Sequence, residues 1–133
     1  MPIQPGLRAE VQAAVGSADT ALALGSGDVE VLGTPRVLAL AEAATVAAVA
    51  SELDPASTTV GSRVELDHLA PSAVGATVRA EAVLAEVSGR RLRFEVTLTG
   101  DGRVVARGTV TRIVVDRGRF GPVARQASTE ERG

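Results

Sequence analysis

The chain has 133 residues, which is enough for one domain with its own hydrophobic core and too short for two. Its 14 basic residues, all of them arginine, are interspersed with 16 acidic residues, and the net charge of −2 gives neither a basic stripe for nucleic acid nor an acidic tail. The absence of cysteine excludes disulfides and thiolate nucleophiles, and a single histidine, His68, cannot by itself form a histidine-rich metal site.

The first apolar pattern covers residues 7–15, where apolar and polar residues alternate as they do in a half-buried strand. Residues 16–33 follow with four glycines and no clear period, which predicts an irregular loop. The GSG at 25–27 is too short for a dinucleotide-binding fingerprint and lacks a strand-to-helix context.

A long apolar helix is predicted next, with the sequence TPRVLALAEAATVAAVASEL over residues 34–53. Thr34 is a good N-cap, Pro35 suits the first helical position, and Asp54-Pro55 stops the helix. The helix is apolar on every side, although Arg36 lies near its start and Glu42 near its middle. Its apolar side chains therefore have to be buried on all sides.

Four more strands follow the helix. The first covers 60–68, the second starts at Val78, the third spans 91–98 and the fourth 103–115, with hairpin turns at SGRR (88–91) and GDGR (100–103). In the 60–68 strand one face is predicted to point inward, and it comprises Val60, Ser62, Val64, Leu66 and His68.

These elements predict an α+β fold in which a five-stranded antiparallel sheet wraps around one long central helix, the hot-dog arrangement. One sheet covers only part of such a helix, so a second copy of the chain is expected to cover the remainder, as in a homodimer. Residues 1–120 form the predicted domain, and residues 121–133 are expected to be a polar C-terminal tail.

Glu42 is the unusual residue of the helix, because Leu38, Thr45, Val46 and Val49 share its sector. A carboxylate among apolar neighbours is a candidate base, although it can also serve as a structural hydrogen-bond acceptor. His68 can transfer protons near neutral pH or be a satisfied core residue, and Thr34 can be catalytic or simply an N-cap.

Several motifs occur in an order that resembles the fluoroacetyl-CoA thioesterase family of hot-dog proteins, over roughly residues 30–115. They are the T-x7-E spacing from Thr34 to Glu42, the G-x6-H strand from Gly61 to His68 with the Pro71 and Gly75 turn after it, SGRRLRFEV at 88–96, and ARGTVTRIVV at 106–115.

The resemblance implies an acyl-CoA thioesterase that acts as a homodimer, with Thr34, Glu42 and His68 as its catalytic group. We expect no metal, because the sequence has few metal-ligating residues, and no cofactor. Glu42 would attack the thioester or activate water, and His68 would shuttle the proton. The Thr34 hydroxyl or backbone amides near Gly33 would bind the oxyanion, while Arg90 and Arg91 could meet the phosphates of coenzyme A. An enoyl-thioester hydratase or dehydratase and a non-catalytic acyl-CoA binding module are the alternatives.

Two features bear on this expectation. In a straight helix Thr34 and Glu42 are about 12 Å apart along the axis, so either the helix begins later or the carboxylate comes from elsewhere, such as the other subunit. The segment LALGSGDVEVLG before Thr34 has no aromatic residue, whereas the fluoroacetyl-specific member carries phenylalanines there, so another acyl group is expected.

The start of the chain lacks the charged, apolar and cleavage regions of a secretory signal. The apolar helix carries Arg36, Glu42 and Ser51, which is atypical of a membrane span. We therefore expect a cytoplasmic protein.

Overall fold

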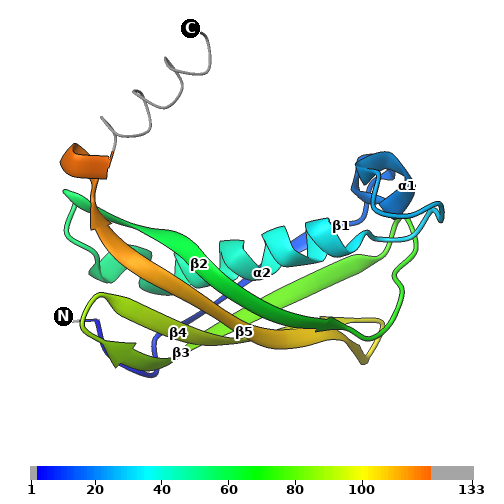
Figure 1. Cartoon of the computed structure of the whole chain (residues 1–133). Helices are drawn as coiled ribbons and strands as arrows, with labels where there is room; N and C mark the ends of the chain where they lie inside the picture. Colours follow the sequence, from blue (N-terminus) through cyan, green and yellow to red (C-terminus); the bar gives the residue numbers. More distant parts are fainter. Residues whose placement is uncertain (1–2, 121–133) are drawn as a thin grey trace, which may run out of the picture.

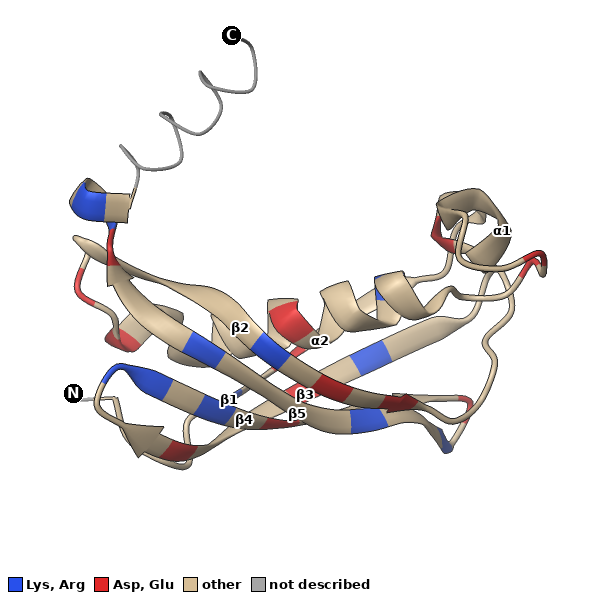
Figure 2. Cartoon of the chain, in the orientation of Figure 1, with Lys and Arg blue, Asp and Glu red and all other residues tan. Residues whose placement is uncertain are grey.

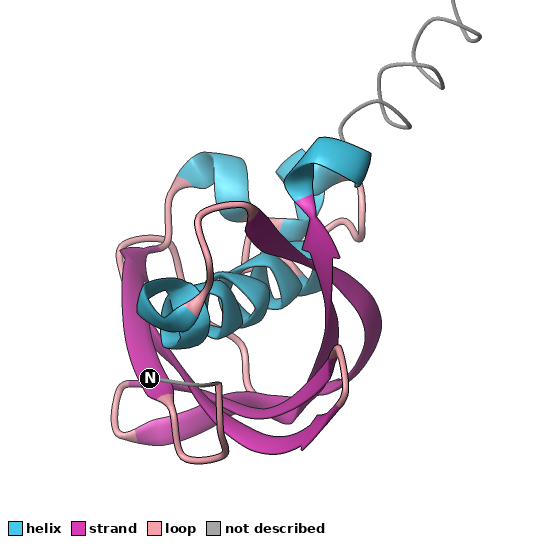
Figure 3. Ribbon diagram, turned by 90° about the vertical axis from the view of Figure 1, so that its left-hand side faces the viewer, coloured by secondary structure: helices cyan, strands magenta, loops and turns pink. Residues whose placement is uncertain are grey.

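The computed structural model describes residues 3–120, in which one long helix lies across the concave face of a curled, five-stranded antiparallel sheet (Figure 1, Figure 3). The strands are β1 (Arg8–Ala14), β2 (Ser57–His68), β3 (Thr77–Ser88), β4 (Arg91–Gly100) and β5 (Arg103–Asp116). They pair in the order β1-β3-β4-β5-β2, so β1 and β2 are the two edges. The α+β class and the wrapped sheet predicted from the sequence are confirmed. The predicted tail, residues 121–133, lies outside the described residues. The longest helix is α2 (Thr34–Val49).

Helix α2 begins one residue earlier than the cap signals predict. Gly33 is the N-cap, with extended φ and ψ of −79° and 146°, and Pro35 lies in the first turn. Thr34 is therefore the first helical residue rather than the cap, which leaves its hydroxyl free for another partner. A short 3-10 helix, η2 (Ala50–Glu52), continues the chain up to the predicted stop.

One face of α2 packs on the sheet and the opposite face is open. The buried face includes Val37, Ala41 and Ala44, each with no exposed surface. On the opposite face Ala43 and Val46 are exposed, the latter at 45%. A single sheet thus covers the helix on one side only, and apolar residues on its other side remain exposed in the single chain.

The stretch predicted as an irregular loop contains two short helices, η1 (Ser17–Asp19) and α1 (Ala21–Leu24). The Thr20 hydroxyl accepts a hydrogen bond from the Ala23 amide at 3.1 Å, and Gly25 ends α1 with a φ of +72°. A helix of one turn leaves no periodicity to detect, so only these cap residues could have revealed it. None of the helices within residues 3–120 is long and apolar enough to cross a membrane.

The sheet encloses a continuous apolar core against the buried face of α2. Phe94 of β4, Leu84 of β3 and Val110 of β5 are fully buried there. Strands β5 and β2 approach unusually closely at Gly108, where an added Cβ would lie 1.9 Å from the Glu65 carbonyl oxygen. Only glycine fits at this position without separating the two strands.

We predict that Gly108→Ala destabilises the fold by roughly 2–3 kcal/mol, because the new methyl group must push β2 away from β5. Urea unfolding followed by circular dichroism measures this change. Gly16→Ala is the matched control, since a Cβ there would lie 3.4 Å from the Asp19 carboxylate, an ordinary contact. Equal unfolding midpoints for the two variants would show that the close approach at Gly108 is not a constraint.

Candidate active site

Thr34 and His68 meet at the N-terminal end of α2. The Thr34 hydroxyl and the His68 Nδ1 form a hydrogen bond of 2.8 Å, and the tautomer of the ring decides which of them donates. His68 is the last residue of β2, and its hydrogen bond to Thr34 places its ring beside the first turn of the helix. Its Nε2 is buried and has no hydrogen-bond partner among residues 3–120. A buried ring nitrogen without a partner is available to a reacting molecule.

Figure 2 shows an acidic position in the middle of α2 and basic positions along β5. Glu42 is the acidic residue of α2, and Arg112 of β5 holds its carboxylate. The Arg112 Nη1 donates to Glu42 Oε2 at 3.0 Å, while its Nε and Nη2 donate to the side chain and carbonyl of Thr59 at 2.8 and 3.0 Å. The Arg112 side chain is only 8% exposed and that of Glu42 is 35% exposed. The carboxylate is therefore fixed through Oε2, and Oε1 makes no hydrogen bond within the described part of the chain.

The motifs in the sequence do not select Arg112 or Thr59, although these two residues hold the Glu42 carboxylate in place. Arg112 alternates in step with Val110 and Val114 on the inward face of β5, and an arginine at a core position is a signal for a buried partner. Glu42 is the carboxylate in the middle of the predicted helix, whereas Glu52 lies at its end. That combination could have predicted the pair.

Gly61 provides the space that the Glu42 carboxylate occupies. A Cβ at Gly61 would lie 2.5 Å from Glu42 Oε2. Gly61 pairs with Arg112 across β2 and β5, and the register shifts between Gly61 and Arg63 at a β-bulge. The glycine, the carboxylate and the guanidinium thus form one close-packed contact.

The bulge at Ser62 corrects the predicted inward face of β2. Residues at an odd spacing of seven, such as Gly61 and His68, point to opposite faces of a regular strand, but the extra residue restores the phase and both face α2. The inward residues Val64, Leu66 and His68 follow the prediction. Val60, which pairs with Ile113 next to inward Arg112, lies on the other face, and Ser62 is the bulge residue itself.

The three predicted catalytic residues form two separate clusters within one chain. Thr34 and His68 lie together at one end of α2, whereas Glu42 lies against Gly61, seven residues before His68 along β2. At about 3.3 Å per residue this places the carboxylate roughly 20 Å from the imidazole. One chain therefore does not bring Glu42 to the Thr34–His68 pair.

The helix start offers one free amide. The sequence analysis expects backbone amides near Gly33 to bind the oxyanion. The Gly33 N–H itself donates to the Asp19 carbonyl at 2.9 Å, so this amide is already occupied. The Thr34 N–H has no partner among the described residues and lies at the positive end of the helix dipole. Gly33 itself is needed for close packing, since a Cβ there would lie 3.0 Å from Leu24 and 3.1 Å from the Ala21 backbone.

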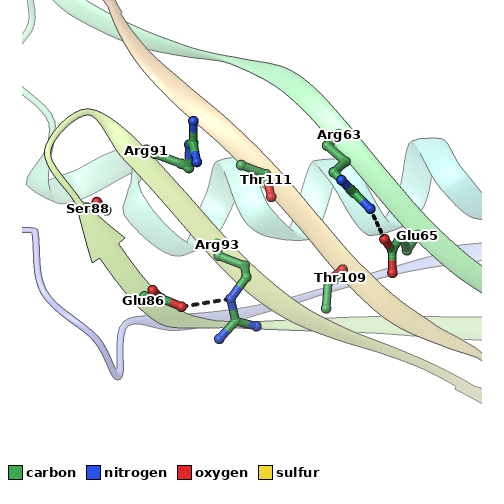
Figure 4. Close-up of a pocket in the computed structure, with 8 residues that line it drawn as sticks. All are labelled: Arg63, Glu65, Glu86, Ser88, Arg91, Arg93, Thr109 and Thr111. Carbon is green, nitrogen blue, oxygen red and sulfur yellow. Dashed lines mark hydrogen bonds and ion pairs between the residues drawn. The ribbon is translucent and has the colours of Figure 1, made fainter.

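Arg90 and Arg91, the predicted phosphate contacts, point to different places. Arg91 lines a pocket of about 410 Å³ on the outer face of the sheet, away from α2 (Figure 4). Ion pairs Arg63–Glu65 and Arg93–Glu86 neutralise four of the charges in this pocket. Arg90 instead lines a pocket at the end of β5 with Arg119 and Phe120, and its Nη1 donates to the Val114 carbonyl at 3.4 Å.

The described residues were also compared with the side-chain clusters that bind metal ions. Within residues 3–120, no group of three or more histidine, aspartate or glutamate side chains could hold a metal ion. The chemistry offered by the two clusters is that of a carboxylate, an imidazole, a hydroxyl and a free backbone amide.

The sequence and the fold are both similar to characterised thioesterases. The family model described as fluoroacetyl-CoA-specific thioesterase matches residues 15–118. The fluoroacetyl-CoA thioesterase of Streptantibioticus cattleyicolor is 33% identical over 97 residues, which are 73% of this chain and 70% of that protein.

Solved structures agree with the sequence comparison. The structure of the fluoroacetyl-CoA thioesterase FlK superposes with a TM-score of 0.87 at 28% identity, covering 95% of this chain and 98% of that one. A Thermus thermophilus thioesterase superfamily member has a TM-score of 0.89 at 22% identity, covering 98% and 97%, and a hot-dog-like protein from Thermanaerovibrio acidaminovorans has 0.83 at 22%, covering 92% and 91%. This chain, a thioester hydrolase of hot-dog fold, belongs to the fluoroacetyl-CoA-specific thioesterase family.

Proposed function

We propose that this protein is a homodimeric acyl-CoA thioesterase that releases a free acid and coenzyme A. Glu42 acts as nucleophile or base, His68 shuttles protons, and Thr34 contributes the oxyanion contacts. The observation that carries the proposal is the hydrogen-bonded Thr34–His68 pair, with a buried, unpartnered His68 Nε2, in a chain of the thioesterase family. A crystal structure of a FlK mutant contains fluoroacetate and CoA, which supports an acyl-CoA substrate for its relatives.

The chemistry can follow two routes. In the first, Glu42 Oε1 attacks the thioester carbonyl, the carbon–sulfur bond breaks, and water hydrolyses the resulting anhydride. In the second, Glu42 takes a proton from water, which attacks the carbonyl directly. In both, His68 delivers a proton to the leaving thiolate, and the Thr34 N–H stabilises the oxyanion at the helix N-terminus.

A dimer resolves the separation between Glu42 and His68. Strand β2 is an edge of the sheet, so a second β2 can pair with it in antiparallel fashion about a two-fold axis. With the axis through Glu65, Arg63 faces the partner subunit's Asp67 on the outer face, and these two opposite-charge pairs flank the two Glu65 carboxylates at the axis. Because the bulge at Ser62 adds one residue, Gly61 then lies opposite the partner subunit's His68, and Glu42 beside Gly61 comes within reach of it.

The acyl group is expected to differ from fluoroacetate. The segment that covers the helix start near Thr34 is aliphatic, and Leu22, Leu24 and Val29 are each between 43% and 56% exposed. Of the two hairpin arginines, Arg90 is the better placed for a coenzyme A phosphate, because Arg91 faces the outer side of the sheet.

Release of free coenzyme A from short, branched, aromatic and 2-enoyl acyl-CoA thioesters tests the proposed activity. We expect turnover of at least one saturated thioester and a decrease in kcat of about a hundredfold or more in Glu42→Gln. The amide keeps an acceptor for Arg112, so this variant is expected to fold, which thermal unfolding checks. Turnover unaffected by Glu42→Gln would contradict the role of the carboxylate, and water addition to the 2-enoyl thioester without CoA release would favour a hydratase.

Mixing of two inactive variants tests the composite site. When Glu42→Gln and His68→Ala chains are unfolded together and refolded, half of the dimers are mixed and each has one intact site. Activity should therefore return to about a quarter of the wild-type value. If both residues act within one chain, the mixture stays as inactive as its components.

A further inference from the structure

Asp19 connects the segment before α2 to the first turn of that helix through all three of its oxygen atoms. Its carbonyl accepts the Gly33 N–H at 2.9 Å, its Oδ1 accepts the Arg36 Nε–H at 3.1 Å, and its Oδ2 accepts the Gly16 N–H at 2.8 Å. The Asp19 and Arg36 side chains are 25% and 36% exposed, so their ion pair is partly shielded from solvent. Asp19 therefore fixes the start of α2 relative to the chain that leaves β1.

The backbone amides at the start of α2 are almost all occupied. The Gly33 N–H donates to the carbonyl just described, and Pro35 has no N–H. The N–H groups of Arg36 and Val37 donate to the Gly33 carbonyl at 3.0 and 3.1 Å. Thr34 therefore carries the one N–H of this first turn that has no partner among residues 3–120, and the position of Gly33 beside it sets the direction of that N–H.

The charges around the helix start are the reverse of what the helix dipole favours. Helix α2 has no acidic residue in its first turn and carries Arg36 there. A cation is unfavourable at the positive end of a helix, whereas an anion is favourable. Arg36 is compensated by the Asp19 carboxylate, which lies outside the helix, and it cancels the negative charge of that carboxylate in turn. The helix start thus has the hydrogen bonds of Asp19 without its net charge.

An uncompensated carboxylate at this place would oppose the proposed reaction. The Thr34 N–H is the amide proposed to stabilise the oxyanion, and the unpartnered His68 Nε2 beside Thr34 marks the same end of the helix. The thioester carbonyl is neutral in the substrate and becomes negative in the transition state, so a nearby anion acts mainly on kcat. We propose that Asp19 is a positioning residue for the Thr34 amide and that Arg36 cancels its charge, so that the amide can stabilise an anion. This assignment rests on the proposed thioesterase activity.

Removal of the arginine charge tests the electrostatic part of the proposal. Arg36→Gln leaves Asp19 charged, and kcat should fall about fivefold with KM unchanged, which is the effect of one unit charge roughly 8 Å away near a protein surface. The substrate is an N-acetylcysteamine thioester, which has no charge, so changes in the binding of coenzyme A phosphates do not contribute. The double variant Asp19→Asn, Arg36→Gln has no uncompensated charge and should recover to within about twofold of the wild-type kcat.

A purely structural ion pair predicts a different order of the variants. The double variant lacks the ion pair just as Arg36→Gln does, so a pair that only joins two segments gives no recovery. The asparagine side chain in the double variant keeps an oxygen that can accept the Gly16 N–H. Arg93→Gln is the matched control, because the Arg93 Nε also pairs with a carboxylate at 3.1 Å and its side chain is 38% exposed, but it lies on the outer face of the sheet (Figure 4). This control should leave kcat unchanged, and thermal unfolding confirms that each variant is folded.

Acetate binding tests the same charges without hydrolysis. The acetate carboxylate takes the place of the oxyanion, and an NMR titration follows the backbone amide resonance of Thr34. We expect this resonance to shift with acetate in the wild type. The Kd should be about fivefold higher in Arg36→Gln and close to the wild-type value in the double variant.

The proposal is overturned if the Thr34 resonance does not respond to acetate, if Arg36→Gln matches the wild type in either kcat or Kd, or if the double variant is as impaired as Arg36→Gln. Absence of thioester hydrolysis by the wild type, together with the expected order of acetate Kd values, would count against the proposed activity alone.

Discussion

The structure depends on one buried guanidinium. Arg112 connects three elements, because it extends from β5, donates twice to Thr59 of β2 and once to Glu42 of α2. A buried arginine is stable only when its donors are satisfied, so the helix carboxylate and the threonine are needed by the fold as much as by any chemistry. This dual requirement explains why an otherwise apolar helix carries a carboxylate at its centre.

The bulge in β2 is the second constraint, and it acts on direction rather than on charge. A strand alternates strictly, so two residues separated by an odd number cannot share a face unless one residue is added between them. Ser62 is that residue, and Gly61 and His68 face the helix as a result. The same local irregularity leaves Arg63, Glu65 and Asp67 on the outer face of the edge strand.

Most of the fold could be predicted from the sequence, because strand alternation and the apolar helix are patterns that extend over many consecutive residues. The position of the bulge could not, since a single inserted residue changes the phase of the strand without changing its composition, and strict alternation therefore places Val60 on the wrong face. The predicted start of the helix differs from the observed one by one residue, because Thr34 and Gly33 are both acceptable N-cap residues. For the site, motif order selects Thr34, Glu42 and His68 as candidates, but their distances within one chain depend on where β2 runs relative to α2. The Arg112 contact was missed because its partners are 53 and 70 residues away in the chain.

The open edge of β2 also bears on how the protein is made. Its twelve residues present unpaired backbone groups along one side of the sheet, and such an edge is a template for non-specific strand addition. The charged side chains of Arg63, Glu65 and Asp67 discourage apolar neighbours but not a strand of complementary charge. A newly synthesised chain is therefore most prone to aggregate after its sheet has formed and before a strand of complementary charge pairs with the edge of β2. Synthesis rate and local chain concentration thus become determinants of yield for a fold whose individual domain is already well packed.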